Sequence, residues 1–128
     1  MKDGFVKAAA ATPDIRVADV AYNTENICKM IDETVANGAK VIVFPELCVT
    51  GYTCGDLFAQ QLLLEEAEMG LIQIVSNTRQ LDIIAILGMP IAMNGVLLNA
   101  AVVIQKGKVL GVVPKLSLIH ISEPTRLA

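Results

Sequence analysis

Three short apolar runs, at residues 5–12, 40–44 and 81–87, limit the folds that are open to this chain. Each run is nearly continuous instead of alternating with polar residues, and the second is rich in β-branched side chains. Strands of this kind are typical of parallel sheets whose faces are covered by helices. We therefore predict an α/β fold built on a parallel sheet.

The segments that separate these runs have helical character. Asn23 or Thr24 is expected to cap a helix that runs to about Asn37, because apolar residues recur at helical spacing between them. Residues 57–80 are expected to form a second, mostly helical segment, and Gly70 can interrupt it. A helix between two buried strands completes a βαβ unit.

The pattern changes after the third run. Short apolar runs at residues 96–104 and 108–113 are each preceded by a turn signal, Asn94-Gly95 and Lys106-Gly107. Such pairs favour tight β-hairpins. We therefore expect antiparallel hairpins at the edge of a mixed sheet.

Composition narrows the class of protein further. The 128 residues are 54% apolar and 18% charged, with a net charge of −3 and a mean hydropathy of +0.57. These values exclude a disordered chain and argue against a nucleic-acid-binding surface. The chain is also more apolar than a domain of its size would normally bury. We expect both a sheet covered on its two faces and a chain that is part of a larger domain.

No membrane-spanning segment is predicted. The longest apolar stretch, at residues 81–93, is broken by Asp82 and Pro90, whereas a spanning helix takes about 20 residues. The N-terminus does not have the pattern of a secretory signal, because Asp3 precedes any apolar run. A cytoplasmic protein is therefore expected.

The three cysteines are Cys28, Cys48 and Cys54. Their odd number favours free thiols in a reducing compartment over a disulfide framework. They form no CxxC motif and have no histidine nearby, so no metal site is predicted.

The last residues differ from the rest of the sequence. Residues 116–126 match, in order, the translation of a transposase adapter used in sequencing libraries. The alternative is a genuine strand followed by a turn at Pro124. On the adapter interpretation residues 116–128 are a non-native tail, His120 is not biological, and the natural chain is interrupted near Lys115.

Two charged residues follow predicted strands. Glu46 comes directly after the second apolar run, at the edge of an α/β sheet where ligands bind. Lys115 follows the last apolar run and Pro114 in the same way. Both are candidate site residues. The alternatives are that Glu46 caps a turn or pairs with a lysine, and that Lys115 is an ordinary solvated lysine.

Three motifs carry a family resemblance. FPEL at 44–47, followed by TGY at 50–52, resembles the glutamate motif of the carbon–nitrogen hydrolase (nitrilase) superfamily, and VVPK at 112–115 resembles the start of its lysine motif. The longer run PELCVTGYTCGDLF at 45–58 is similar, more narrowly, to the glutaminase domains of glutamine-dependent NAD synthetases. The resemblance covers residues 4–115.

The resemblance implies an α-β-β-α sandwich, of which residues 1–115 would be the N-terminal part and the rest would be truncated. It also implies a Glu-Lys-Cys triad, with Glu46 as general base and Lys115 stabilising the oxyanion. Tyr52 would line the glutamine pocket. The nucleophilic cysteine of the family follows the lysine, so it would be absent from this chain, and none of the three cysteines present takes its position.

The resemblance further implies that the parent protein hydrolyses glutamine and passes ammonia to a C-terminal synthetase domain, which uses ATP and magnesium to amidate deamido-NAD. No cofactor is expected in this segment, the intact protein would be a homo-oligomer, and this chain alone would be inactive. Two alternatives stay open: another carbon–nitrogen hydrolase, such as an aliphatic amidase or carbamoylase, and a non-enzymatic α/β interaction domain.

Overall fold

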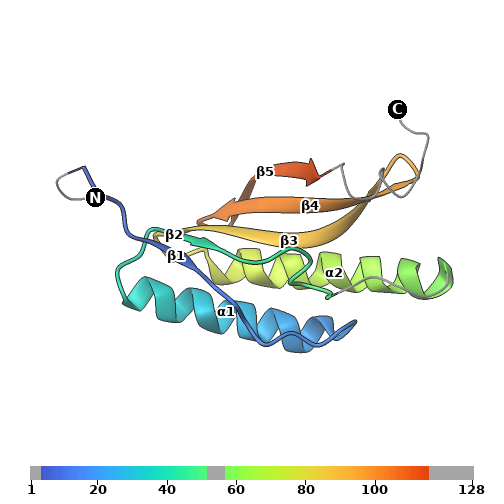
Figure 1. The fold of residues 1–128 in the computed structure, drawn as a ribbon, viewed down its shortest axis with the longest axis horizontal. Coiled ribbons are helices and arrows are strands. Elements are labelled where there is room, and N and C mark those ends of the chain that lie inside the picture. The colour runs from blue at the N-terminus through green and yellow to red at the C-terminus, as the bar shows by residue number, and fades with distance from the viewer. Residues whose placement is uncertain (1–3, 52–56, 116–128) are drawn as a thin grey trace.

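Two helices and a five-stranded sheet make up the part of the chain that the computed structural model describes, residues 4–51 and 57–115. In chain order the elements are β1 (Ala8–Ala10), α1 (Val20–Ala36), β2 (Val41–Val43), α2 (Leu57–Asn77), β3 (Ile84–Met93), β4 (Val96–Gln105) and β5 (Lys108–Lys115). The strands lie side by side in that same order, β1 to β5 (Figure 1).

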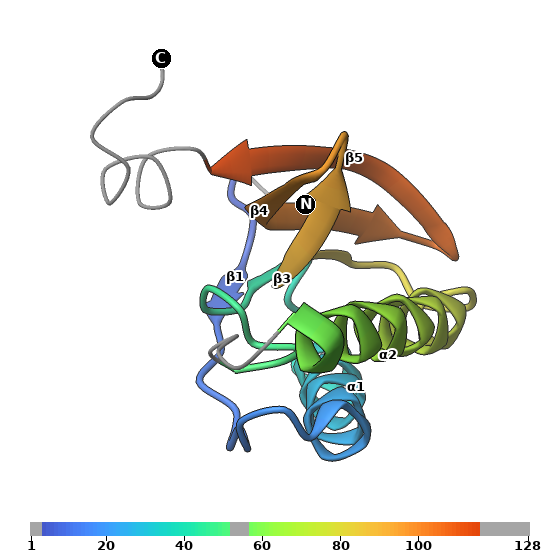
Figure 2. The ribbon, with the colours of Figure 1, turned by 90° about the vertical axis from the view of Figure 1, so that its right-hand side faces the viewer.

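The sheet is mixed, as the sequence predicts. β1, β2 and β3 are parallel, and β4 and β5 are added to them as antiparallel strands. Both helices lie on one side of the sheet (Figure 2). The core lies between them and the sheet, and its fully buried side chains include Ile27 and Ile31 of α1, Ile74 of α2 and Leu87 of β3. The α/β fold is therefore confirmed.

The sheet face away from the helices carries apolar side chains with large exposed fractions. Val43 of β2 is 41% exposed and Val113 of β5 is 60% exposed. Val43 pairs with Ile86 of β3, and Gly88, two residues further along β3, lies on the same face as Ile86. Gly88 in turn pairs with Ala101 of β4, which pairs with Val113, so the register places Val43 and Val113 on one face of the sheet. In the described residues, therefore, the helices cover only one face of the sheet.

Two predicted strands have different bounds in the structure. The first is limited to Ala8–Ala10, because its neighbour β2 offers only Val41–Val43 for pairing. The third begins later and runs past the predicted end to Met93, through Pro90. Proline is tolerated there because β2 pairs only with residues 84–86, so that edge of β3 has no strand beside it at Pro90.

The start of α1 also differs from the prediction. The cap is Asp19, whose carboxylate accepts a hydrogen bond from the Tyr22 N–H at 3.1 Å, and not Asn23 or Thr24. Aspartate caps helices as well as asparagine does. The helix therefore begins one turn earlier, and this frees Asn23 for another role, described below.

Gly70 does not interrupt α2. The helix is continuous through it, and α1 approaches closely at this point. A Cβ atom on Gly70 would lie 2.6 Å from Thr24 Oγ1 and 2.8 Å from Val20 Cγ1. The glycine therefore allows the two helices to pack together.

The two hairpin turns are confirmed. Asn94 and Gly95 have φ values of 54° and 79°, and Lys106 and Gly107 have 48° and 79°. Positive φ at both central residues is the requirement of a type I′ turn. These turns join β3 to β4 and β4 to β5.

Candidate active site

Glu46 lies at the carboxyl end of β2, on the rim of a cavity in the sheet face away from the helices. The Phe44 N–H donates to the Ile86 carbonyl at 2.9 Å and extends the parallel pairing up to the loop that carries Glu46. The cavity has a volume of about 330 Å³, and the residues that line it come from β2, its loop, β3, β4 and β5: Val43, Phe44, Pro45, Glu46, Ile86, Leu87, Gly88, Asn99, Ala100, Ala101, Val113 and Pro114. Glu46 is thus the carboxylate of a mainly apolar depression.

Gly88 of β3 lies directly beneath this loop. A Cβ atom at this position would lie 2.5 Å from the Leu47 nitrogen and from the Pro45 oxygen, and 2.8 Å from Glu46 Cα. These neighbours are all backbone atoms and cannot turn away as a side chain can. Gly88 therefore permits the close approach that sets the position of Glu46.

Cys48 attaches the same loop to β3. Its thiol donates to the Gly88 carbonyl at 3.6 Å, and the Gly88 N–H donates to the Cys48 sulfur at 3.5 Å. The Val49 N–H donates to the same carbonyl at 3.2 Å. Burial raises the pKa of the Cys48 thiol to about 11, so this side chain is a structural contact and not a nucleophile at neutral pH.

Cys28, on α1, is also unsuited to nucleophilic chemistry. Burial, with the charge of Asp32 adding to it, raises the pKa of its thiol to about 11. Cys54 lies outside the described residues.

We expect both described thiols to react slowly with iodoacetamide. A rise of the thiol pKa from 9.0 to about 11 lowers the thiolate fraction at pH 7.5 roughly 100-fold. Peptide-level mass spectrometry should therefore show Cys28 and Cys48 alkylated roughly 100-fold more slowly in the folded protein than in urea. Equal rates with and without urea would contradict this assignment of Cys48.

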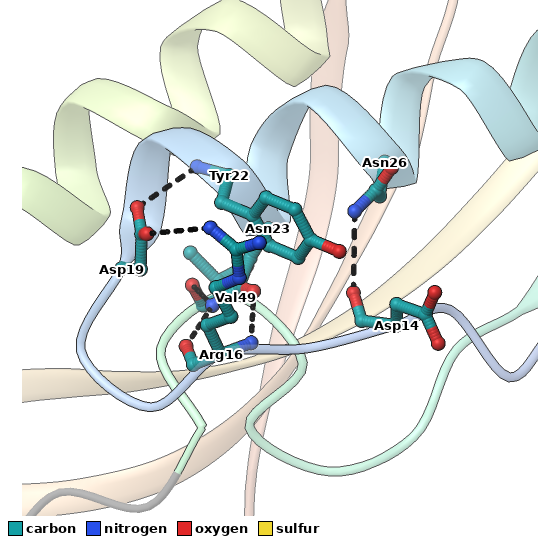
Figure 3. Close-up of polar contacts among 7 residues, drawn as sticks. All are labelled: Asp14, Arg16, Asp19, Tyr22, Asn23, Asn26 and Val49. Atoms are coloured by element: carbon teal, nitrogen blue, oxygen red, sulfur yellow. Dashed lines mark hydrogen bonds and ion pairs between the residues drawn. The ribbon is translucent and has the colours of Figure 1, made fainter.

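A buried asparagine holds the other side of the loop (Figure 3). Asn23 Nδ2 donates to the Val49 carbonyl at 3.0 Å and to the Arg16 carbonyl at 2.8 Å, and Oδ1 accepts from the Arg16 N–H at 2.7 Å. The Arg16 guanidinium lies 3.8 Å from the centre of the Tyr22 ring and pairs with Asp19 at 3.8 Å. Asn23 therefore joins α1, the segment before it and the loop that carries Glu46.

Asn99 of β4 contacts Glu46 directly. Its Nδ2 donates to Glu46 Oε2 at 3.3 Å. Asn99 also lies opposite Lys115 in the β4–β5 register, so the backbone of Lys115 ends β5 beside it. The structure thus brings Glu46 and the position of Lys115 to the same region of the sheet. Tyr52 lies outside the described residues.

Gly88 and Asn99 are site residues that the sequence prediction did not include. The available signals were weak: Gly88 falls inside an apolar run, and Asn99 is a polar residue inside a predicted strand, where asparagine is disfavoured. Neither signal indicates that the residue contacts Glu46, which is 53 positions away from Asn99.

The described residues contain no group of three or more His, Cys, Asp and Glu side chains arranged to hold a metal ion. Neither helix, over the residues that are described, is long and apolar enough to cross a membrane.

Comparison with known proteins identifies the family. The carbon-nitrogen hydrolase family model matches residues 7–128. The chain is 38% identical over 112 residues to a glutamine-dependent NAD(+) synthetase of Mycobacterium bovis. The aligned region is 88% of this chain but only 16% of that protein.

Solved structures give the same result. The crystal structure of a glutamine-dependent NAD(+) synthetase from Cytophaga hutchinsonii superimposes with a TM-score of 0.77 at 29% identity, over 86% of this chain and 19% of that one. An amidase from Nesterenkonia sp. superimposes with a TM-score of 0.72 at 20% identity, over 92% and 45% of the two chains, and this shows the shared fold alone. The chain belongs to the carbon–nitrogen hydrolase family.

Proposed function

We propose that this chain is the N-terminal part of a glutamine-hydrolysing domain, in which Glu46 is the general base. The observation that carries the proposal is the position of Glu46. The loop that carries it follows the parallel strand β2 and is held against β3 by Gly88 and Cys48. Strand β5 ends nearby, at Lys115. The similarity to two glutamine-dependent NAD(+) synthetases supports glutamine as the substrate.

In this proposal the reaction is acyl transfer through a cysteine that lies beyond Lys115. Glu46 takes the thiol proton, and the thiolate attacks the side-chain carboxamide carbon of glutamine. The ammonium group of Lys115 stabilises the oxyanion of the tetrahedral intermediate. Glu46 then returns the proton to the leaving nitrogen as the C–N bond breaks, and ammonia leaves. The regenerated carboxylate deprotonates the water that hydrolyses the thioester to glutamate, and the cysteine sulfur takes that proton back as it departs. Tyr52 would line the glutamine pocket.

The parent protein would pass this ammonia to a C-terminal synthetase domain that amidates deamido-NAD. That domain would bind ATP and magnesium, and no residue of the present chain is assigned to either. Residues 116–128 would be a non-native tail, and the present chain alone would have no glutaminase activity, since it would lack the nucleophile. Glu46 is exposed in the described residues, so its shielding would come from the rest of the domain.

Sequencing the DNA across the Lys115–Leu116 junction tests this proposal first. An uninterrupted reading frame should continue into a cysteine after a further strand and then into an ATP-using synthetase domain. A stop codon soon after the hydrolase domain would instead favour an amidase or carbamoylase, and a continuation without a cysteine would refute the triad.

Glutamine hydrolysis by the full-length protein is then expected to depend on Glu46. Glu46→Gln keeps the size of the side chain but removes its basicity, so kcat should fall at least about 1,000-fold, within the range of general base catalysis. Glutamate release measures this. NAD formation from free ammonia, which bypasses the hydrolase site, should be unchanged and serves as the folding control. A Glu46→Gln variant with ordinary glutaminase activity would refute the proposed role.

A further inference from the structure

In the contact between Asn99 and Glu46, the asparagine is the hydrogen-bond donor and the carboxylate is the acceptor. A carboxylate only accepts hydrogen bonds, so the amide nitrogen of Asn99 must face it. The Nδ2–Oε2 distance of 3.3 Å is at the long end for such a bond, and the half-buried Asn99 comes from a different strand than Glu46. The contact therefore joins two sides of the cavity.

Asn99 is an unusual residue for its place in the strand. Its side chain lies on the sheet face away from the helices, and it pairs with Pro90 of β3, whereas its neighbours Leu98 and Ala100 point to the helix-covered side and are buried. Asparagine has low β-propensity and carries a polar group that must be hydrogen-bonded where it is desolvated. Asn99 takes no part in the apolar core, and its side-chain amide contacts the Glu46 carboxylate instead.

A neutral amide is suited to hold a general base. A lysine or arginine in its place would strongly favour the carboxylate form of Glu46 and weaken it as a proton acceptor, whereas an amide fixes one oxygen without adding charge. The hydrogen bond to Oε2 thus restrains the carboxylate while its negative charge and its basicity are kept.

We propose that Asn99 is a positioning residue for Glu46: it holds Oε2 by a hydrogen bond and so fixes the orientation of the carboxylate for proton transfer. This inference rests on the proposed function of Glu46 as general base. It assigns Asn99 no contact with the reacting atoms, and its expected signature is a change in kcat and in the pH profile, with little change in KM.

The test uses the full-length protein and two substitutions. Asn99→Leu removes the hydrogen bond at nearly constant shape, and we expect kcat for glutamine hydrolysis to fall about 10- to 100-fold with KM changed less than about twofold. Asn99→Asp places a second carboxylate beside Glu46, which opposes its ionisation, so the acidic limb of the kcat/KM profile should move up by about one pH unit. Because a nearby carboxylate moves this limb by its charge alone, the shift shows that residue 99 adjoins Glu46 in the working enzyme, and the fall in kcat at unchanged KM for Asn99→Leu shows that the hydrogen bond positions it.

The control is Gln105→Leu, a matched polar-to-apolar change at the other end of β4, which should leave kcat and the pH profile unchanged. Should Asn99→Leu fail to fold, shown by loss of ammonia-dependent NAD formation, the smaller change Asn99→Ala carries the same kcat test. The inference is overturned if Glu46→Gln is inactive while the apolar variant keeps the wild-type kcat, or while Asn99→Asp keeps the wild-type acidic limb. If Glu46→Gln is active, it is the proposed function that fails.

Discussion

In the full-length protein, Gly88→Ala should lower the free energy of unfolding by about 3 kcal/mol and the proposed glutamine hydrolysis by roughly 100-fold. The added methyl group would lie 2.5 Å from two backbone atoms of the loop that carries Glu46. Overpacking of this kind typically costs about 1–3 kcal/mol, and here no flexible side chain is available to move aside. The loop must shift instead, and a shift of about 1 Å at a catalytic group can cost 10²-fold in rate.

Gly111→Ala is the matched control for this prediction. Gly111 lies in β5 of the same sheet, and a Cβ atom there would have no neighbour within 4 Å. This variant should therefore keep the stability and activity of the unsubstituted full-length protein. Thermal unfolding and glutamate release, measured on both variants, check the prediction. Equal behaviour of the two would show that the close approach at Gly88 is not required.

Asn23→Leu should destabilise the protein by about 3–4 kcal/mol. The leucine side chain has a similar shape, so the change leaves little cavity but removes the partners of three backbone groups: the Arg16 N–H, the Arg16 carbonyl and the Val49 carbonyl. Asn23 is fully buried, and each buried group left without a partner costs about 1–3 kcal/mol. Denaturant unfolding measures the loss. Because Val49 belongs to the loop that carries Glu46, glutamine hydrolysis should also fall.

Asn26→Leu is the comparison on the same helix. Asn26 lies about one turn further along α1 and donates to the Asp14 carbonyl at 3.4 Å, a long bond at the surface (Figure 3). Its replacement should cost less than about 0.5 kcal/mol, as is usual for surface substitutions. A loss from Asn23→Leu no larger than that from Asn26→Leu would mean that water replaces the buried amide.

The hydrophobic pattern predicts the main features of this fold. The run at 40–44 is too short for a helix and nearly continuous, so it predicts a strand covered on both faces. The strand forms as β2, but only Ile42 is buried and Val43 is 41% exposed, because in the described residues the helices cover one face of the sheet. The Asn94-Gly95 and Lys106-Gly107 pairs have a local backbone requirement that is visible in the residues themselves, and both turns form as predicted. Features that depend on a few adjacent residues are therefore readable from the chain.

Features that depend on pairing between distant segments cannot be predicted from the residues around them. Pro90 ends a strand by local rules, but the edge of β3 is free at that residue, and this follows only from where β2 ends. The cap of α1 is similarly ambiguous, because Asp19, Asn23 and Thr24 all favour that position. At the site, Glu46 is predictable from its place after a strand, whereas Gly88 and Asn99 acquire their roles only when β3 and β4 pair beside it.

The separation of these residues along the chain has a consequence for the order of folding. The β3–β4–β5 meander is built from neighbours in sequence and can form early, whereas parallel pairing of β2 with β3 requires closure of a loop that includes α2. Cys48 meets Gly88 across 40 positions, and Glu46 meets Asn99 across 53. The carboxylate therefore takes its place only after the slowest closure step, so a partly folded or newly synthesised chain would carry Glu46 without its contact to Asn99 and without the loop geometry on which the proposed role depends.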